Sequence, residues 1–375
     1  MAILGTQLSR VDDMQALSSS LDRMHVDPIK HDPLQHPLAR LTTNPSALTY
    51  ISAFAGDKIQ KDDNPVGIAN TVLFLKNYVA GARPIMTLAK RDGLDQVLGK
   101  TSKVKVVRAY DVLSGAEIAL KKASHYDSPT ESASEKAQDL ALKEREKVRE
   151  RRALMMLHRY YGELSLEKKD RKVDYIAQEL VNGDDVAKFL NKKNDLLMIE
   201  KDQSALKEHF EDLVKVAYLF CQEVHAFNAL GMIHRDIKPE NMMVNKEDGN
   251  FTLKLIDFGG AIHVSEAATD LDKDYGTQGY KAPEIEQGQF SFATDAYAVG
   301  ASLSKFTELM NAGCFRIFLA KNKECKAIKE ALERVSHALM DPIVEKRMRL
   351  SDFLTVLAPL GELLAKQQSM RQIHK

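Results

Sequence analysis

A carboxylate, a lysine and an asparagine stand close together in the run from Gly231 to Val244, between two apolar segments. They are Asp236, Lys238 and Asn241, and a second carboxylate, Asp257, follows the next apolar segment. Transfer of a phosphoryl group from a metal-bound nucleotide needs a carboxylate for the attacking hydroxyl, a cation near the phosphates and oxygen ligands for Mg²⁺. The residue types and their spacing therefore predict a phosphotransferase site.

The composition excludes several other classes of protein. The chain has 375 residues with 53 basic and 53 acidic side chains, and a general nucleic-acid binder would carry a clear basic excess. Cys221, Cys314 and Cys325 lack the spacing of a zinc site or a disulfide framework, which indicates a reducing compartment. No segment has the length and apolarity of a membrane span, and the N-terminus does not resemble a signal peptide. We expect a cytoplasmic protein.

The composition also divides the chain. Residues 1–90 are rich in Ser, Asp, His and Pro, and we expect a partly ordered extension with a helix over Ile68–Val79. The alternative is a targeting or secretion segment, as in bacterial effectors delivered into host cells. Residues 91–181 favour strands, residues 182–366 favour helices, and residues 367–375 form a tail. This order predicts an α+β, two-lobed architecture with a ligand cleft between a small β-rich lobe and a larger helical lobe.

Hydrophobic periodicity predicts the individual elements. In the first lobe, strands are expected at Val104–Tyr110, Glu117–Leu120 and Val173–Leu180, with a loop over Ser124–Ala137 and one key helix over Leu140–Tyr161. The second lobe is expected to contain a long amphipathic helix over Leu206–Leu230, a hairpin of Met242–Val244 with Phe251–Ile256, and helices from Asp295 onward.

The run His234-Arg-Asp-Ile-Lys-Pro-Glu-Asn241 and the triplet Asp257-Phe-Gly259 resemble the catalytic and metal-binding loops of eukaryotic-type protein kinases. The resemblance implies that Asp236 is the catalytic base and that Lys238 neutralises charge on the transferred phosphate. It also implies that Asn241 and Asp257 are the Mg²⁺ ligands, and that ATP is the phosphate donor. The alternative, in which Asp236 and Asn241 only cap a turn, leaves the rest of the string unexplained. The resemblance runs from Gln96 to Leu364.

Upstream, Ala119-Leu-Lys121 resembles the kinase strand whose lysine holds the α- and β-phosphates. Strand alternation places Lys122 on the opposite face. The acidic partner of Lys121 is expected to be Glu150, with Glu146 as the alternative one turn earlier.

The predicted phosphate-covering loop, Leu98-Gly-Lys-Thr-Ser-Lys-Val-Lys-Val106, retains Gly99 and Val106 of the family pattern. Thr101 and Val104 replace two glycines, so this loop is expected to approach the nucleotide less closely. The resemblance further implies roles in binding the nucleoside: Leu98, Val106, Ala119 and Met243 around adenine, Glu179 and Val181 as backbone partners of the base, Gln178 at the back of the pocket, and Asp185 at the ribose.

Two further segments are typical of protein kinases. Gly276–Glu284 resembles the peptide-docking end of the activation segment, in which Thr277 would bond Asp236 and Lys238 and favour Ser/Thr substrates. Asp295 resembles the aspartate that holds the catalytic-loop backbone. Glu284 then requires a buried cation, for which the family position indicates Arg349.

Arg235 is expected to face the activation segment, where Ser265, Thr269 and Tyr275 are phosphoacceptors. The same segment contains Asp270, Asp272 and Asp274. One of these carboxylates could pair with Arg235, or with Arg149 or Arg152, without phosphorylation. This hypothesis predicts basal activity in unmodified protein; the alternative is a solvated acidic loop.

The sequence thus favours an ATP- and Mg²⁺-dependent Ser/Thr protein kinase that acts on protein substrates. The depleted glycine loop leaves a pseudokinase scaffold as the alternative, although such a scaffold needs none of Lys121, Asp236, Asn241 and Asp257. A small-molecule phosphotransferase is disfavoured by the docking segment. The oligomeric state and the physiological substrate stay open.

Overall fold

The computed structural model describes residues 69–77, 81–88, 97–100, 104–111, 116–126, 132–168, 171–191, 202–270, 275–311, 313–353 and 355–356. The chain divides into two compact units. Among the described residues the first unit holds strands β1 to β7, and the second holds most of helix α4 and everything from Val181 onward. Most of the predicted extension, residues 101–103 of the phosphate loop, and the tail lie outside the described residues.

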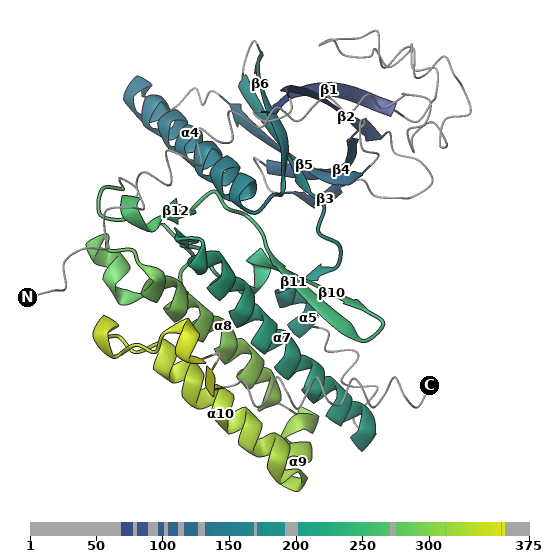
Figure 1. The fold of residues 1–375 in the computed structure, drawn as a ribbon, viewed down its shortest axis with the longest axis vertical. Coiled ribbons are helices and arrows are strands. Elements are labelled where there is room, and N and C mark those ends of the chain that lie inside the picture. Colours follow the sequence, from purple (N-terminus) through teal and green to yellow (C-terminus); the bar gives the residue numbers. More distant parts are fainter. Residues whose placement is uncertain are drawn as a thin grey trace, which may run out of the picture. The chain divides into compact units, whose positions relative to one another are not determined.

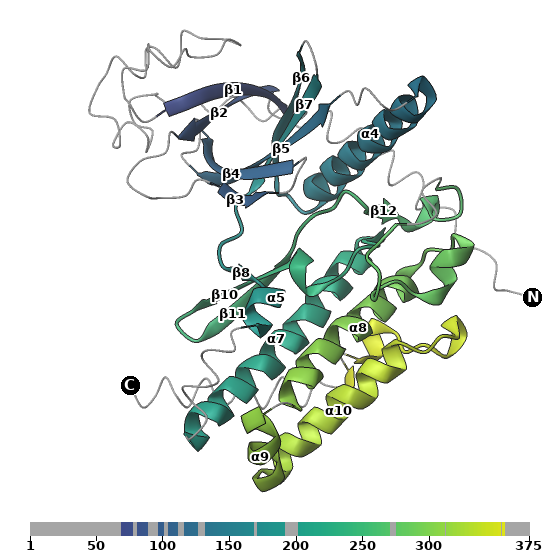
Figure 2. The same ribbon diagram turned by 180° about the vertical axis from the view of Figure 1, so that it is seen from behind.

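The first unit is a curled antiparallel sheet (Figures 1 and 2). Its strands are β1 (Ala69–Asn77), β2 (Gly81–Leu88), β3 (Val97–Lys100), β4 (Val104–Asp111), β5 (Glu117–Tyr126), β6 (Tyr160–Lys168) and β7 (Arg171–Glu179). They are hydrogen-bonded in the order β2-β1-β6-β7-β5-β4-β3. In addition, β2 pairs with the end of β4, where Ile85 opposes Asp111, while β3 pairs with the start of β4. Six strands therefore close into a barrel, with β3 on the outside.

The interior of this barrel is filled by small and branched apolar side chains. Its fully buried cluster consists of Ile85, Ala109, Ile118, Leu120 and Ala177. Because side chains alternate along a strand, Ile118 and Leu120 point inward, whereas Ala119 and Lys121 of β5 point to the other face.

One element of the sequence-based interpretation is wrong here. Ile68–Val79 was expected to be a helix, but Ala69–Asn77 is strand β1, paired antiparallel with β2. Both strands precede residue 91 and nevertheless belong to the same sheet as β4 to β7. A short apolar run does not distinguish a strand from a helix by its spacing alone, and the hydrogen bonds to β2 decide the outcome.

Helix α4 (Ala133–Met156) begins and ends earlier than expected. Ser132 and Glu135 form a capping box: the Ser132 N–H donates to Glu135 Oε2 over 2.8 Å, and the Glu135 N–H donates to Ser132 Oγ over 3.2 Å. At the other end His158 has a left-handed φ of 55°, and Tyr160 and Tyr161 already belong to β6. The expected helix over Leu140–Tyr161 is therefore correct in its centre and wrong at its C-terminus.

The second unit is built on long helices that lie side by side in both views, α7 (Gln203–Ala229), α8 (Phe292–Met310) and α10 (Lys323–Leu339), with α9 (Gly313–Lys321) beside them. Asp202 caps α7 by accepting from the Ser204 and Ala205 N–H groups. The predicted apolar face of α7 is buried: Phe210, Leu213, Ala217, Phe220, Val224 and Phe227.

Short strands and turns of the second unit position the predicted catalytic loop. The hairpin is confirmed as β10 (Met242–Glu247) and β11 (Asn250–Leu255), with β8 (Asp184–Asp185) on its edge and helix α5 (Val186–Leu190) following. Strand β9 (Met232–Ile233) pairs with β12 (Ile262–His263). The 3₁₀ turns are η3 (Pro239–Asn241), η4 (Val264–Glu266), η5 (Pro283–Gln287) and η6 (Val344–Lys346). The catalytic loop thus lies between β9 and β10.

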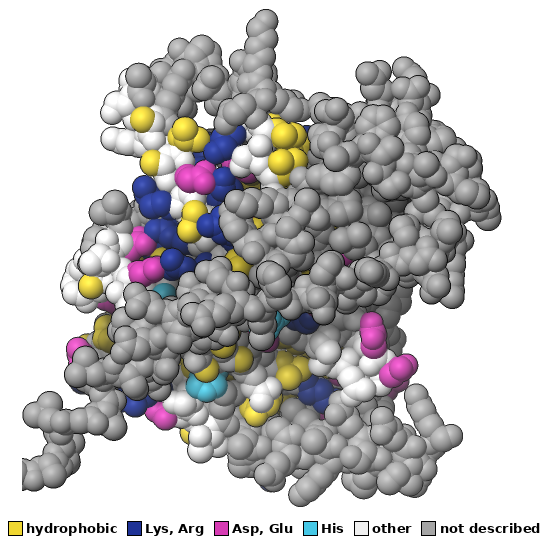
Figure 3. Space-filling view, turned by 45° about the horizontal axis from the view of Figure 1, so that its top comes forward, with side chains coloured by type: hydrophobic (Ala, Val, Ile, Leu, Met, Phe, Trp, Pro, Cys, Tyr) yellow, Lys and Arg dark blue, Asp and Glu magenta, His cyan; other side chains and the backbone are white. Residues whose placement is uncertain are grey.

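On the face drawn in Figure 3, lysine and arginine side chains of the described residues are interspersed with aspartate and glutamate. Among the helices of the described ranges, none combines the length and the apolarity needed to cross a membrane.

Candidate active site

The backbone of the catalytic loop is fastened to helix α8 by Asp295, as the sequence predicts. Asp295 is 1% exposed, and its carboxylate accepts from the N–H groups of His234 (2.8 Å) and Arg235 (3.0 Å). The Asn228 amide donates to the same carboxylate (2.9 Å) and to the Met232 carbonyl (2.9 Å). Burial raises the pKa of Asp295, and these donors oppose the rise. Sequence reasoning missed Asn228, because no local pattern marks an amide that contacts distant residues.

His234 connects the catalytic loop to the hydrophobic core. Its ring is fully buried and lies edge-on to Phe227 and Phe258, with centroids 5.7 and 5.5 Å away. Nε2 lies 3.3 Å from the Ile256 carbonyl, and Nδ1 accepts from the Asp236 N–H over 3.3 Å, which assigns the Nε2-protonated tautomer. Burial lowers the pKa of His234. The imidazole is therefore a neutral part of the core.

Asp236 lies at the centre of a compact polar network. Its Oδ1 accepts from the Thr277 hydroxyl over 2.6 Å. Its Oδ2 accepts from Lys238 Nζ over 2.8 Å and from Asn241 Nδ2 over 2.9 Å. Lys238 Nζ also donates to Thr277 Oγ1 over 2.7 Å, so the hydroxyl both accepts and donates. The hydrogen bonds thus bring together four residues that the sequence assigned to one site: Asp236, Lys238, Asn241 and Thr277.

Thr277 reaches this network because of a glycine turn. Gly276 has φ +115°, a conformation that L residues rarely adopt, and a Cβ there would lie 2.8 Å from the Arg235 carbonyl oxygen. The chain can therefore pass close to the catalytic loop only with glycine at this position. The next residue then places its hydroxyl on Asp236.

The second predicted metal ligand, Asp257, has a left-handed φ of 63°, as Arg235 does with 71°. Such backbone costs about 1–2 kcal/mol per residue and is found at functional sites. Around it, Phe258 is fully buried against Phe227, with ring centroids 5.4 Å apart. The Ile256 N–H donates to the Asn241 carbonyl over 2.9 Å. The segments that carry Asn241 and Asp257 are therefore directly connected.

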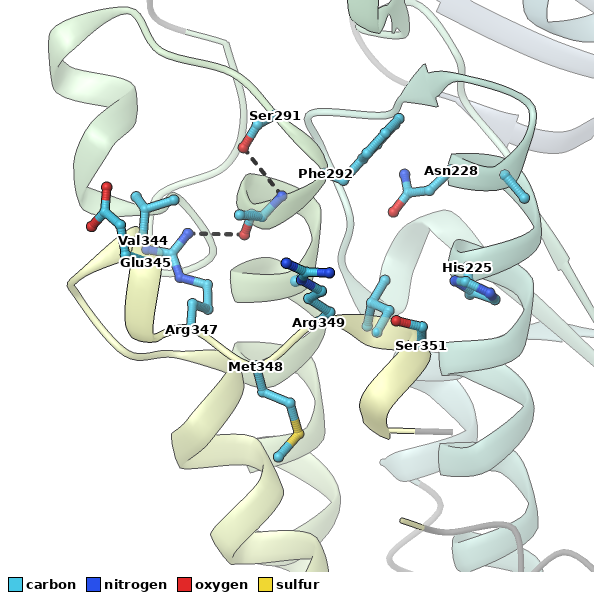
Figure 4. A pocket seen from close by; sticks show the side chains of 14 residues that line it. His225, Asn228, Ser291, Phe292, Val344, Glu345, Arg347, Met348, Arg349 and Ser351 are labelled. Atoms are coloured by element: carbon cyan, nitrogen blue, oxygen red, sulfur yellow. Dashed lines mark hydrogen bonds between the residues drawn. The ribbon is translucent and has the colours of Figure 1, made fainter. Parts of the chain in front are cut away.

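The sequence indicated Arg349 as the buried partner of Glu284, and this prediction is wrong: the partner is Arg347. Arg347 Nη1 and Nη2 donate to the two oxygens of Glu284 over 2.5 and 2.9 Å, and Arg347 is 0% exposed in its side chain. Nη1 also donates to the Ala293 carbonyl at the start of α8. Both arginines line a cavity of about 580 Å³, together with residues of α7, α8 and the segment 344–351. Figure 4 shows the two side chains at this cavity. Arg349 is exposed; the turn η6 presents Arg347 to α8 instead.

Three of the predicted nucleotide residues belong to the second unit. Met243 of β10 lies opposite Asp185 of β8 in the strand register. Asp185 caps α5 by accepting from the Lys188 N–H over 2.8 Å, and its other oxygen pairs with Lys188 Nζ over 2.8 Å. Val181 immediately follows the first unit. The predicted contact of Asp185 with a ribose stays a prediction.

The other nucleotide residues lie on the first unit. Lys121 and Ala119 share the face of β5 that points away from the barrel core, and Val106 of β4 lies directly opposite Lys121. Lys122 faces the other way, with Nζ 5.8 Å from the centroid of the Tyr175 ring. The alternation that selected Lys121 over Lys122 is confirmed.

The remaining residues of this group surround the same strands. Gly99 lies opposite Val106 in the register, and Leu98 is 41% exposed. Gln178 lies opposite Ala119, and the Glu179 N–H donates to the Arg159 carbonyl over 2.9 Å. Their contacts with a nucleotide stay predictions.

Of the two candidate acidic residues on α4, Glu150 is the buried one. It is 4% exposed, whereas Glu146 is half-buried and accepts from the Tyr275 hydroxyl over 3.4 Å. A carboxylate that is removed from water needs a cation or several donors. Glu150 is therefore the candidate whose charge must be compensated inside the protein.

Comparison with known proteins gives the family of the chain. The family model described as "Protein kinase domain" matches residues 94–371. The Serine/threonine-protein kinase PknG of Mycobacterium leprae is 27% identical over 200 residues, which cover 52% of this chain and 24% of that protein. CBL-interacting serine/threonine-protein kinase 24 of Arabidopsis thaliana is 29% identical over 187 residues, or 47% of this chain and 38% of that protein. The chain thus spans well under half of the length of these curated relatives.

Among solved structures, the ROP18 kinase domain in complex with AMP-PNP and sucrose superposes with a TM-score of 0.53 at 16% identity. The match covers 89% of this chain and 94% of that one. At this identity the likeness concerns the fold, which is the one that the motifs predicted.

Proposed function

Because the chain belongs to the protein kinase domain family, we propose that it transfers the γ-phosphate of ATP to serine and threonine hydroxyls of protein substrates. The network around Asp236 carries the proposal. It combines a carboxylate, an ammonium group and a hydroxyl within hydrogen-bond distance of one another. A phosphoryl transfer enzyme needs mainly positioned charges, since the transition state is loose and highly charged.

In the proposed reaction Asp236 orients the substrate hydroxyl and accepts its proton. Lys238 neutralises negative charge on the transferred phosphoryl group, while its second contact with Thr277 holds the ammonium group in place. The bond between Lys238 and Thr277 also supports the preference for serine and threonine, because this pair is typical of Ser/Thr kinases. Asp295 and His234 do not touch the reactants; they hold the backbone on which Asp236 stands.

The donor set fits Mg²⁺, which prefers oxygen ligands and is usually held by one or two carboxylates together with phosphates and water. Both hydrogen bonds of the Asn241 amide nitrogen go to Asp236, at 2.8 and 2.9 Å, which leaves its oxygen to serve as a ligand. Asp257 would supply a carboxylate. When bound, Mg²⁺ neutralises charge on the β- and γ-phosphates.

For ATP we propose the residues of the β5 face and its neighbours. Lys121 would hold the α- and β-phosphates and pair with Glu150, which is supported by the burial of Glu150 and by the outward direction of Lys121. The solved neighbour in complex with AMP-PNP and the relatives named as Ser/Thr kinases support a nucleotide ligand. The base and ribose would contact Leu98, Val106, Ala119, Glu179, Val181, Asp185 and Met243, and Gly99 would lie over the phosphates.

The test is transfer of label from γ-labelled ATP to a generic basic protein in the presence of Mg²⁺. Asp236→Ala and Lys121→Ala should each abolish transfer. Lys122→Ala is the matched control for Lys121, because the two lysines are adjacent but lie on opposite faces of β5, and it should retain transfer. Phosphoamino-acid analysis of the product should give phosphoserine and phosphothreonine without phosphotyrosine.

The pseudokinase alternative has its own observable result. The phosphate-covering segment has only Gly99 of its three expected glycines. A scaffold would bind nucleotide, detected as a shift in thermal stability with ATP and Mg²⁺, without any transfer of label. That result would refute catalysis and retain the nucleotide site.

A further inference from the structure

Arg235, the residue before the proposed catalytic base, is enclosed on all sides by polar and aromatic groups. Its side chain is 0% exposed. The guanidinium carbon lies 4.9 Å from the centroid of the Tyr275 ring and 4.8 Å from that of Phe290, and Nε donates to the Gly260 carbonyl. Burial lowers the pKa of Arg235, and the charge of Asp270 opposes this. A buried cation of this kind needs an anion nearby.

Asp270 is that anion, and it serves two arginines at once. Its Oδ1 accepts from Arg235 Nη1 over 3.1 Å, and its Oδ2 accepts from Arg149 Nη2 over 2.5 Å. The side chains of Asp270 and Arg149 are only 7% and 8% exposed. One carboxylate thus connects the catalytic loop with helix α4, and Glu150 follows Arg149 directly on that helix.

The surrounding contacts strengthen the same connection. Arg152, one turn further along α4, pairs with Glu266, although both side chains are more than 40% exposed. The Tyr275 hydroxyl reaches Glu146 on the same helix. Exposed pairs contribute little, so the two-armed contact of Asp270 carries most of the electrostatic link.

Arg149 and Arg235 have their anion without a phosphate on the neighbouring hydroxyls, Thr269 and Ser265. Thr269 precedes Asp270, is exposed, and donates from its hydroxyl to the Glu266 carbonyl. Ser265 is exposed and lies 2.7 Å from His263 Nδ1. A phosphate on Thr269 would bring a second anion beside a carboxylate that already occupies both arginines. Asp272 and Asp274, the other acidic residues considered from the sequence, lie outside the described residues.

We propose that Asp270 is a positioning residue that takes the place of an activating phosphate. By bridging Arg149 and Arg235 it holds α4 and the catalytic loop in their working arrangement, so the unmodified protein is active. This inference deepens the proposed kinase function and rests on it. Asp270 acts through the two arginines and does not touch the reactants.

The experiment uses the full chain, freed of phosphate by phosphatase and checked by mass spectrometry. Wild-type protein should transfer phosphate. Asp270→Asn, which keeps the shape and removes the charge, should lower kcat on the order of a hundredfold, because the catalytic loop and α4 lose the anion that joins them. Asp270→Glu should recover most of that loss. Glu266→Gln, which breaks the exposed ion pair of the same segment, should change kcat by less than about threefold.

A second set of measurements separates positioning from mere folding. Asp270→Asn should retain cooperative thermal unfolding and its Kd for ATP. Arg149→Gln should reproduce the loss of kcat, and the double variant with Asp270→Asn should be no worse than the more impaired single variant, because both changes break one bridge. Additive losses, or an Asp270→Asn variant as active as the wild type, would overturn the inference.

The outcomes for the wild type distinguish this inference from the proposed function. If dephosphorylated protein is inert but protein carrying phosphothreonine at position 269 is active, the kinase function stands and the role of Asp270 is refuted. If both forms are inert, the kinase function itself fails, and the inference fails with it.

Discussion

Arg347→Met offers the sharpest test of the structure, because it shows whether Arg347 or Arg349, two positions further on, is the buried partner of Glu284. The Arg347 side chain donates four hydrogen bonds: two to Glu284, one to the Ala293 carbonyl and one from Nε to the Asp341 carbonyl over 2.9 Å. The substitution leaves the Glu284 carboxylate buried without its cation. Removal of one member of a buried pair costs about 3–5 kcal/mol, which is a large part of the ~5–15 kcal/mol that stabilises a typical protein.

Urea unfolding followed by circular dichroism measures this free energy directly, and thermal unfolding should show a fall in Tm of about 4–6 °C for a chain of 375 residues. Arg349→Met is the matched control: the side chain is exposed, so the change should stay within about 0.5 kcal/mol. The double variant Glu284→Gln with Arg347→Met should recover part of the loss, since no unpaired charge is then buried. Equal losses for the two arginine variants, or a greater loss for Arg349→Met, would refute the assignment.

Three further predictions concern the catalytic loop. Thr277→Val should lower kcat about 10- to 100-fold, because it removes hydrogen bonds to two charged groups, while Thr277→Ser should retain activity in the same kinetic assay. Gly276→Ala should destabilise the protein by more than ~1 kcal/mol in urea unfolding, whereas Gly279→Ala, with positive φ but nothing within 4 Å of the new Cβ, should cost less. The folded-state pKa of His234 lies below the unfolded value of 6.5, so its contribution to stability is present above pH 6.5 and is lost as pH falls through the folded pKa. Thermal unfolding measured at a series of pH values should therefore show a smaller fall of Tm below pH 6.5 in His234→Phe. The control His337→Gln, at an exposed position, should show the same fall of Tm as the wild type.

The sequence predicts most of what depends on local pattern. The apolar spacing from Leu206 to Leu230 anticipates the buried face of α7, and the alternation at Ala119 and Lys121 anticipates the outward face of β5. The loop motif places Lys238 on Asp236, because a short motif of this kind encodes a local backbone shape. Thr277 joins them from a separate segment, through the turn at Gly276. The start of α4 could have been found as well, since Ser132 and Glu135 have the spacing of a capping box.

What the sequence does not predict depends on distant partners. The run Ala69–Asn77 becomes a strand because β2 and β6 supply its hydrogen bonds. Helix α4 ends near His158 in a left-handed conformation without the glycine that usually marks such an end. The choice of Arg347 over Arg349 rests on the turn η6, whose C-cap residue is Arg347, and Arg347 then donates to the Ala293 carbonyl of α8. For strand β1 and for Arg347 a distant residue takes part: Glu163 of β6 in the first case and Ala293 of α8 in the second.

The closure of the barrel has a practical meaning for work with shorter versions of this protein. The family match begins at residue 94, so a fragment cut there would lack β1 and β2. The open edge of β4 near Asp111 and the free edge of β6 would then be exposed to other chains, and the apolar interior around Ala109 and Ile118 would lose Ile85. A fragment meant to stay monomeric in solution should therefore start before Ala69, ahead of the segment that matches the family model.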